Sequence, residues 1–208
     1  MSNSRKRHYA SEQRERTARL NRERVLSSAR ILFGKRGIEA VRIDEIAEAA
    51  GVSASMIYAT FRSREGILRA LMQDALFGPH YADALALLDS ETDPVQLIGL
   101  TAGVARAIYE GEARELGLIR EIAAYSPALR AIEKEFDDIR YEAQHQRIKD
   151  LFARRRARKG LELGAARRIL WMYTSREVYR MFVTDGGWTP DEYEAWLRET
   201  LLTALVKP

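Results

Sequence analysis

One segment, residues 42–61, constrains the fold of this chain more than any other. Apolar residues recur at the helical spacing i, i+3, i+4, i+7 from Ile43 to Ala50. Gly51 then supplies the left-handed conformation that commonly ends a helix, and Ser53 is a good N-cap for a following one. The pattern therefore predicts two short helices that meet at a tight corner of fixed angle.

The second helix of this corner, about residues 53–60, has one inward and one outward face. Ile57 and Phe61 are four residues apart and are expected to be buried, which turns the other side chains outward. A bracing helix, a fixed corner and an exposed second helix form a helix-turn-helix, in which the second helix enters the major groove of DNA. The residues predicted to contact DNA from this corner are Ser53, Ala54, Ser55, Met56, Tyr58, Thr60 and Arg62.

The segment AEAAGVSASMIYATFRSREGIL, residues 47–68, with the preceding FGKRGIEAVRIDEIA, is similar to the DNA-binding domain of the tetracycline-repressor (TetR) family of bacterial regulators. The similarity covers about residues 22–71. It implies a homodimer whose two heads bind a double-stranded operator. It also implies a small-molecule effector, of unknown identity, that binds the C-terminal domain and controls the release or capture of DNA.

The resemblance also implies roles for three residues. Tyr58 stands where the family has a tyrosine whose hydroxyl reaches a phosphate, and Arg64 stands in place of a lysine that addresses a phosphate at the start of the fourth helix. Arg42 departs from the family pattern, which has Thr or Ser as the N-cap here. Because an arginine side chain cannot accept hydrogen bonds from the free N–H groups of a helix start, we expect a weaker start to this helix. We also expect Arg42 to contact a phosphate directly.

Positive charge is concentrated at the N-terminal end. Residues 1–70 carry 15 Lys and Arg against 8 Asp and Glu, whereas the remainder carries 19 against 22. Clustered Lys and Arg are typical of a surface that neutralises phosphates, although a basic surface that is only solvated has the same composition. Residues 1–20 lack apolar periodicity and are predicted to be a basic, mostly disordered arm. Such an arm either contacts DNA or takes no part in binding.

Helical spacing continues almost throughout the rest of the chain, so the predicted class is all-α with about nine helices. The expected division is a helix-turn-helix domain at 21–70 and a helical ligand-binding and dimerisation domain at 71–208. Beyond the corner, helices are expected at 68–89, 94–111, 114–124, 127–158, 164–184 and 190–206.

Two sets of residues in the C-terminal domain are predicted to bind partners. The last two helices carry broad apolar stripes, and the resemblance places a homodimer interface there, with burial inside one subunit as the alternative. The predicted interface residues are Leu170, Tyr173, Val178, Met181, Tyr193, Trp196, Leu197 and Leu201. Aromatic residues of the middle helices could line an effector cavity or simply fill the core. The predicted ligand-binding residues are Tyr109, Tyr125, Phe136, Tyr141, Trp171 and Met172.

The composition argues against several other functions. The chain has no cysteine and only scattered histidines, at His8, His80 and His145, so no metal site or cofactor is expected. No nucleophile motif or phosphate loop occurs, and no catalytic residue is predicted. No apolar stretch is long enough to span a bilayer, and no secretory h-region follows the basic N-terminus, so we expect a cytoplasmic protein without membrane contact.

The sequence thus predicts a ligand-responsive transcriptional regulator, most often a repressor in such a family, that binds a palindromic operator as a dimer. Two other functions remain open at this point. An all-α enzyme with a buried small-molecule cavity would use the C-terminal domain, and a nonspecific architectural DNA-binding protein would use the basic N-terminal end.

Overall fold

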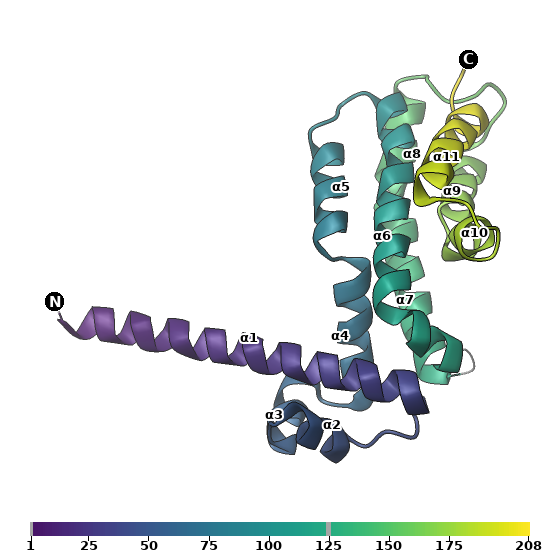
Figure 1. Cartoon of the computed structure of the whole chain (residues 1–208). Helices are drawn as coiled ribbons and strands as arrows, with labels where there is room; N and C mark the ends of the chain where they lie inside the picture. Colours follow the sequence, from purple (N-terminus) through teal and green to yellow (C-terminus); the bar gives the residue numbers. More distant parts are fainter. Residues whose placement is uncertain (1, 124–125) are drawn as a thin grey trace. The chain divides into compact units, whose positions relative to one another are not determined.

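The computed structural model of the protein describes residues 2–123 and 126–208, and within them every regular element is helical, which confirms the all-α class (Figure 1). The elements are α1 (Ser2–Arg36), α2 (Ile43–Ala50), α3 (Ala54–Phe61), α4 (Arg64–Leu76), α5 (Pro79–Asp89), α6 (Pro94–Ala123), α7 (Pro127–Ala143), α8 (His145–Ala153), α9 (Leu163–Tyr173), α10 (Arg176–Tyr179), a π-helical turn at Arg180–Thr184, and α11 (Pro190–Leu205). None of the described helices contains a stretch long and apolar enough to cross a bilayer.

The chain divides into two compact units. Unit 1 comprises residues 1–72 and 116–130, and unit 2 comprises residues 73–115 and 131–208. Their boundaries fall within α4, α6 and α7, so these helices contribute to both units. This division puts the two-helix corner in unit 1 and most of the predicted ligand and dimer residues in unit 2.

Helix α1 differs from the flexible arm that the sequence predicted. It runs without a break from Ser2, so most of the arm is an extension of the first helix. Local contacts favour this helix: the Ser11 hydroxyl donates to Glu15 at 3.1 Å, and Arg19 pairs with Glu23 at 3.9 Å, each four residues on. Periodicity failed to reveal it because its N-terminal half has no apolar face. The helix ends where Gly37 adopts a left-handed φ of 79°.

The core of unit 1 is built from the apolar stripes that the sequence indicated. Val25 and Phe33 of α1, Ile46 of α2, Ile57 of α3 and Leu68 of α4 each have 0% of their surface exposed. Burial of each such side chain contributes about 1.5–3 kcal/mol relative to exposure. The core therefore holds α2 and α3 rigidly against α1 and α4.

Several helix boundaries in unit 2 differ from the prediction. The expected helix at 68–89 is broken at Gly78, where Pro79 begins α5. The two helices expected at 94–111 and 114–124 are instead one helix, α6. A side chain at Gly111 would place its Cβ 2.7 Å from the Ala75 carbonyl oxygen, so this glycine marks a close approach of two helices rather than a helix end.

The expected helix at 164–184 is interrupted at Thr174 by a buried polar network. Arg140 of α7 donates through Nη1 to the Trp171 carbonyl oxygen at 2.6 Å and to the Thr174 hydroxyl oxygen at 2.8 Å. The Gln144 amide also donates to that hydroxyl, at 2.8 Å. These bonds satisfy carbonyl groups at the end of α9, and the Ser175 hydroxyl then caps α10. Because the residues that break the helix lie 30 or more positions earlier in the chain, the sequence around Thr174 gives little indication of the break.

Candidate nucleic-acid interface

The corner between α2 and α3 has the predicted geometry. Gly51 has a left-handed φ of 62°, and its N–H donates to the Glu48 carbonyl at 3.1 Å. The Arg24 guanidinium of α1 donates to the Gly51 carbonyl oxygen at 2.9 Å. At the start of α3, the Ser53 hydroxyl accepts a bond from the Met56 N–H at 3.2 Å, which confirms the predicted N-cap. The corner is thus fixed both by its own caps and by a contact from α1.

Helix α3 presents the outward face that the spacing predicted. Ile57 is fully buried and Phe61 is 7% exposed, whereas Tyr58 is 54% exposed. Ser55 and Thr60 are also exposed, and the Thr60 hydroxyl donates to the Met56 sulfur at 3.5 Å. Small side chains at the start of α3 allow its backbone to approach a partner closely. The phenol of Tyr58 is free to reach beyond the helix.

A strained turn joins α3 to α4. Arg62 has φ 68° and ψ −39°, and the Ser63 N–H donates to the Phe61 carbonyl oxygen at 2.8 Å across it. This is a γ-turn with positive φ at its central residue, which is rare for residues other than glycine. The turn directs the Phe61 carbonyl at α4, where a Cβ on Gly66 would lie only 1.8 Å from the carbonyl oxygen. Gly66 is therefore required by the turn, which explains why no acidic residue of a capping box stands there.

Arg64 does not lie where the sequence analysis placed it. Its Nη1 is 2.6 Å from the Glu39 carbonyl oxygen, 3.2 Å from that of Ile38 and 3.4 Å from that of Val41. Because three carbonyl groups of the α1–α2 loop hold this guanidinium, the Arg64 side chain is a structural link within unit 1. All three of these bonds use Nη1, so a phosphate contact by Arg64 stays a prediction for its other guanidinium nitrogens.

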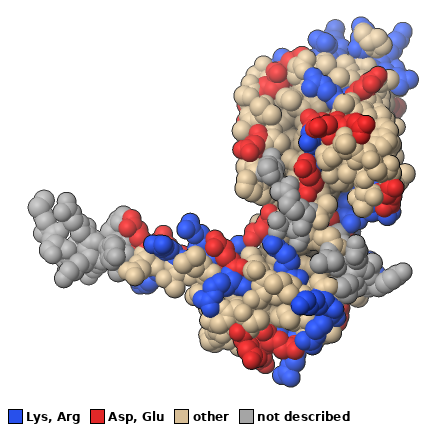
Figure 2. All heavy atoms as spheres, in the orientation of Figure 1, with Lys and Arg blue, Asp and Glu red and all other residues tan. Residues whose placement is uncertain are grey.

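The start of α2 is stabilised by Glu45 in place of an N-cap side chain. Its carboxylate accepts from the Arg42 N–H at 2.7 Å and from the Arg36 guanidinium at 2.7 Å. These two donors hold the pKa of Glu45 below its usual range. Arg42 itself is exposed and lies 3.5 Å from Asp44. Figure 2 shows that Lys and Arg are spread over the surface of unit 1 and that Asp and Glu also occur there, both along α1 and on the helices below it.

These features agree with a comparison against known families. The model of the bacterial regulatory proteins of the tetR family matches residues 25–71, which span the buried part of α1, the corner and most of α4. Residues 25–71 are thus similar to the region that this tetR family model describes.

A curated relative shows a similarity of the same kind over part of the chain. The HTH-type transcriptional repressor KstR2 of Mycolicibacterium smegmatis is 30% identical over 108 residues, a match that covers 46% of this chain and 51% of that protein. The chain thus spans about half the length of the curated relatives it matches.

Solved structures share the fold across most of the chain. NalD of Pseudomonas aeruginosa, the secondary repressor of the MexAB-OprM multidrug efflux pump, has a TM-score of 0.70 at 21% identity and matches 91% of this chain and 98% of its own. FadR of Bacillus subtilis, solved in complex with stearoyl-CoA, has a TM-score of 0.65 at 17% identity and matches 86% and 96%. At these identities the similarity shows the fold alone.

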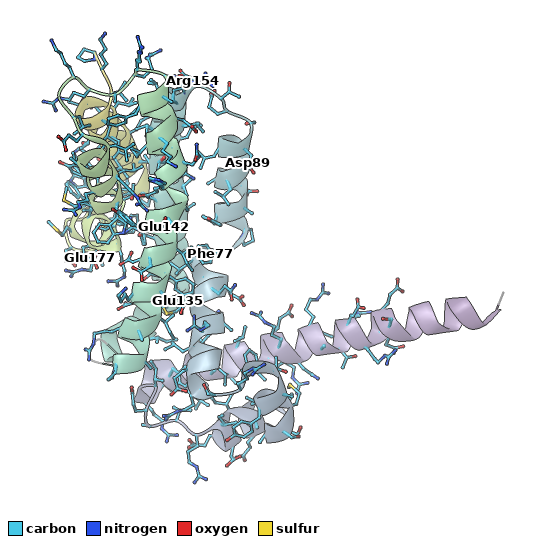
Figure 3. The ribbon with its side chains drawn as sticks, turned by 180° about the vertical axis from the view of Figure 1, so that it is seen from behind. Phe77, Asp89, Glu135, Glu142, Arg154 and Glu177 are labelled. Carbon is cyan, nitrogen blue, oxygen red and sulfur yellow. The ribbon has the colours of Figure 1, made fainter. Side chains whose placement is uncertain are left out.

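Three of the predicted ligand residues line one groove in unit 2. The groove has a volume of about 460 Å³ and is lined by Asp138, Tyr141, Arg168, Ile169, Trp171 and Met172. The Arg167 guanidinium stacks on the Tyr141 ring at 3.7 Å and donates to Glu142 at 2.6 Å (Figure 3 labels Glu142). The buried Trp171 Nε1 has no hydrogen-bond partner among the described residues.

The other predicted ligand residues lie elsewhere. Tyr109 is 6% exposed and donates to the Thr174 carbonyl oxygen at 3.1 Å, and burial raises the pKa of its phenol. It is a core residue of unit 2 and does not line the groove at Tyr141 and Trp171. Phe136 packs against Phe77, with ring centroids 5.5 Å apart, and is not part of the groove. Tyr125 lies outside the described residues.

Half of the predicted dimer residues are buried within one protomer. Leu170, Tyr193, Leu197 and Leu201 each have 0% exposure. A side chain without exposed surface has none to lose against a second subunit, so their predicted role in the interface is wrong. The stripes of α9 and α11 are wide because these helices pack against each other and the rest of unit 2.

The other predicted dimer residues keep accessible surface. Met181 of the π-helical turn is 59% exposed, while Tyr173, Val178 and Trp196 are half-buried. Trp188, which the sequence analysis did not select, is 38% exposed, and its ring lies 4.7 Å from that of Phe182. The rings of Phe182, Trp188 and Trp196 lie within 6.2 Å of one another, and these rings with the exposed Met181, which precedes Phe182 in the chain, are here called the aromatic patch.

Sequence reasoning also missed two other contributors to the sites. Arg24 anchors the corner through the Gly51 carbonyl, a contact 27 residues away that no spacing rule indicates. The groove between α1 and α3 was missed as well. Gln13, Thr17 and Asn21 follow each other at four-residue spacing in line with the buried Val25, and this spacing could have revealed the face of α1 that forms the groove.

Proposed function

We propose that the protein is a ligand-responsive transcriptional repressor that binds a palindromic operator as a homodimer. The observation that carries this proposal is α3 itself, capped at Ser53 and held by Ile57 and Phe61, with Tyr58 exposed on the opposite face. A rigid helix with this face fits the major groove. The match to a curated repressor supports the sign of control.

Direct contacts to DNA divide between phosphates and bases. Tyr58, Arg42 and Arg62 would address phosphates, which set affinity and register. Ser53, Ala54, Ser55, Met56 and Thr60 would face the base edges. None of these five side chains offers the paired donors or acceptors that read guanine or adenine directly. We therefore expect specificity from methyl contacts, bridging waters and the shape of the operator.

The groove at Tyr141 and Trp171 is the proposed effector site. It combines two aromatic rings with the flexible Met172, which is 48% exposed, and with Arg168. These groups suit a small apolar or aromatic molecule with an acceptor for the Trp171 N–H and an anionic group for Arg168. An effector acts only if it binds the DNA-free and DNA-bound states with different affinity. The complex of FadR with stearoyl-CoA is a precedent for an apolar effector with an anionic end.

The aromatic patch is the proposed contact with a second subunit. Exposed Met and Trp side chains are enriched at the buried centre of interfaces and are unusual on a surface that stays wet. A dimer through this patch would supply the two heads that a palindrome requires.

The test is a mobility shift on the DNA directly upstream of the protein's own gene. We expect binding at least a thousandfold tighter than to a random duplex of the same length, because specific and nonspecific affinities differ by that factor or more. Equal affinity for the two duplexes would refute operator binding and favour an architectural protein.

The role of Tyr58 is tested in the same assay with Tyr58→Phe. Loss of one phosphate hydrogen bond, about 1.5 kcal/mol, weakens binding to both duplexes by about tenfold. Tyr81→Phe, a matched change on α5 in unit 2, leaves both affinities unchanged. If Tyr58→Phe binds both duplexes as the wild type does, the assigned contact does not exist.

A further inference from the structure

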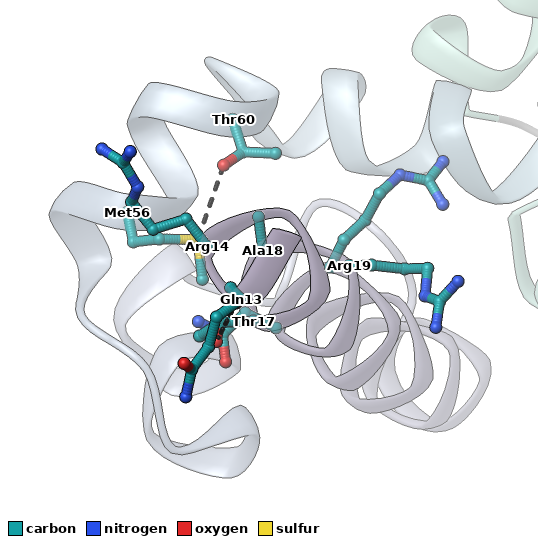
Figure 4. Close-up of a pocket in the computed structure, with 9 residues that line it drawn as sticks. Gln13, Arg14, Thr17, Ala18, Arg19, Met56 and Thr60 are labelled. Atoms are coloured by element: carbon teal, nitrogen blue, oxygen red, sulfur yellow. Dashed lines mark hydrogen bonds between the residues drawn. The ribbon is translucent and has the colours of Figure 1, made fainter. Parts of the chain in front are cut away.

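A groove of about 750 Å³ lies between the N-terminal half of α1 and the outward face of α3, within unit 1 (Figure 4). The lining residues of its α1 wall and those of its α3 wall are more than 30 positions apart in sequence. The lining residues are Gln13, Arg14, Thr17, Ala18, Arg19, Asn21 and Arg22 from α1 and Met56 and Thr60 from α3.

The α1 wall is the continuation of the face that packs in the core. Gln13, Thr17 and Asn21 follow each other at four-residue spacing, and the next positions of this series are Val25 and Ala29, both fully buried. From Val25 onward this face is apolar and contacts its own domain. Before Asn21 it is polar and faces a groove, so α1 offers there a surface suited to a charged or hydrogen-bonding partner.

The charge of the lining is of one sign. It contains Arg14, Arg19 and Arg22 and no acidic residue. Glu15, which accepts from Ser11, and Glu23, which pairs with Arg19 at 3.9 Å, are not among the lining residues. Arg14 and Arg22 are eight residues apart, or about 12 Å along the helix axis. Such a row of cations complements a chain of phosphates rather than a single small anion.

The residues of the α3 wall indicate that these phosphates would belong to the DNA strand beside α3. Met56 and Thr60 stand on the outward face of α3, and a helix in the major groove is flanked on both sides by a sugar–phosphate strand. The groove runs along one flank of α3. Ala18 at its centre is small, and the Thr17 hydroxyl is occupied by the Gln13 carbonyl at 2.9 Å, so the α1 wall favours contact with a backbone over reading of bases.

We propose that this groove holds one sugar–phosphate strand of the operator, with Arg14 and Arg22 pairing with its phosphates. The inference rests on the proposed function in that α3 must enter the major groove. The inference adds a second DNA-binding element to the proposed function. This element is the N-terminal half of α1, which contacts the strand from the side opposite to α3. The contact is independent of sequence, so it raises affinity for operator and random duplex alike.

The test measures the salt dependence of DNA binding by the full-length chain. Each lost phosphate contact lowers the slope of log K against log[salt] by about 0.9 per protomer, which is roughly an eightfold loss of affinity at 0.1 M salt relative to 1 M. We expect this change for Arg14→Gln and about twice this change for Arg14→Gln with Arg22→Gln. The matched control is Arg16→Gln, which removes the same charge from the same helix at an exposed position outside the groove.

A hydroxyl-radical footprint locates the strand. The wild type and Arg16→Gln should protect a run of sugars beside each major-groove site, and the double variant should lose this protection while keeping protection by α3. Circular dichroism and the melting temperature of each variant verify that α1 remains folded, as expected for helix positions that receive Gln, a good helix former.

Equal salt slopes for Arg14→Gln and Arg16→Gln, or an unchanged footprint for the double variant, would overturn the proposal. So would a double variant that changes only the response to a small molecule. The slopes are measured on a random duplex as well as on the upstream DNA. A chain that fails to prefer its upstream DNA would refute the proposed function, while the difference between Arg14→Gln and Arg16→Gln on the random duplex still decides the role of the groove.

Discussion

Replacement of Gly66 by alanine should lower the stability of unit 1. It lies in the first turn of α4, where an alanine would ordinarily be the better helix former by about 1 kcal/mol. In this structure the added Cβ would stand 1.8 Å from the Phe61 carbonyl oxygen, about 1.5 Å or more short of a normal contact. The Phe61 carbonyl belongs to backbone, so no side-chain rotation relieves the clash.

The size of the effect follows from the groups that must move. Separating the two atoms disrupts the γ-turn at Arg62 and its Ser63-to-Phe61 hydrogen bond, which contributes about 1 kcal/mol. Overpacking of this kind costs about 1–3 kcal/mol more. After the gain in helix propensity, Gly66→Ala should destabilise the protein by about 2 kcal/mol, or roughly 4–8 °C in melting temperature for a chain of this size.

The assay is thermal unfolding followed by circular dichroism, with Gly117→Ala as the control. Gly117 lies in α6 with open space where its Cβ would be, so that variant should gain stability by helix propensity alone, about 1 kcal/mol. Below its transition, Gly66→Ala should also bind the upstream DNA more weakly, because the turn sets the direction of α3. If Gly66→Ala is as stable as Gly117→Ala, the close approach of Phe61 does not exist and the reasoning fails.

Two further predictions concern unit 2. Arg140→Ala removes the donor that satisfies the Trp171 and Thr174 oxygens, so the free energy of unfolding should fall by about 2–3 kcal/mol. Denaturant titration measures this free energy. A loss under about 0.5 kcal/mol would contradict the role of the network. Met181→Asp places a charge in the aromatic patch, so sedimentation should show monomers with wild-type stability, and an intact dimer at micromolar concentration would place the interface elsewhere.

The corner of the DNA-binding domain could be predicted closely because its signals are local. Gly51 needs a left-handed φ, Ser53 caps within three residues, and Ile57 and Phe61 define a face by spacing alone. Each of these features acts through the residues next to it in sequence. The exposure of Tyr58 then follows from the burial of its neighbour.

The failures of prediction share the opposite property. Arg64 binds carbonyl groups 23 to 26 residues earlier, a structural role that no pattern along the sequence indicates. Leu197 and Leu201 were assigned to a dimer because an apolar stripe records that a face is buried without recording what covers it. Arg140 ends α9 from another helix. The sequence therefore determined residue environments well and residue partners poorly wherever the partner was distant.

The arrangement of arginines suggests how this domain divides affinity from specificity. In the proposed complex, the outward face of α3 would offer Ser, Ala, Met and Thr to the bases, and these side chains would form few strong hydrogen bonds and depend on close fit. Such a face discriminates between DNA sequences only when α3 is held at the correct depth in the major groove. The charged groups that could hold it there lie around this face rather than on it, and they are Arg42, Arg62, Arg14 and Arg22. Charge placed outside the reading face strengthens every complex equally, so it leaves the differences between sequences to the small side chains of α3.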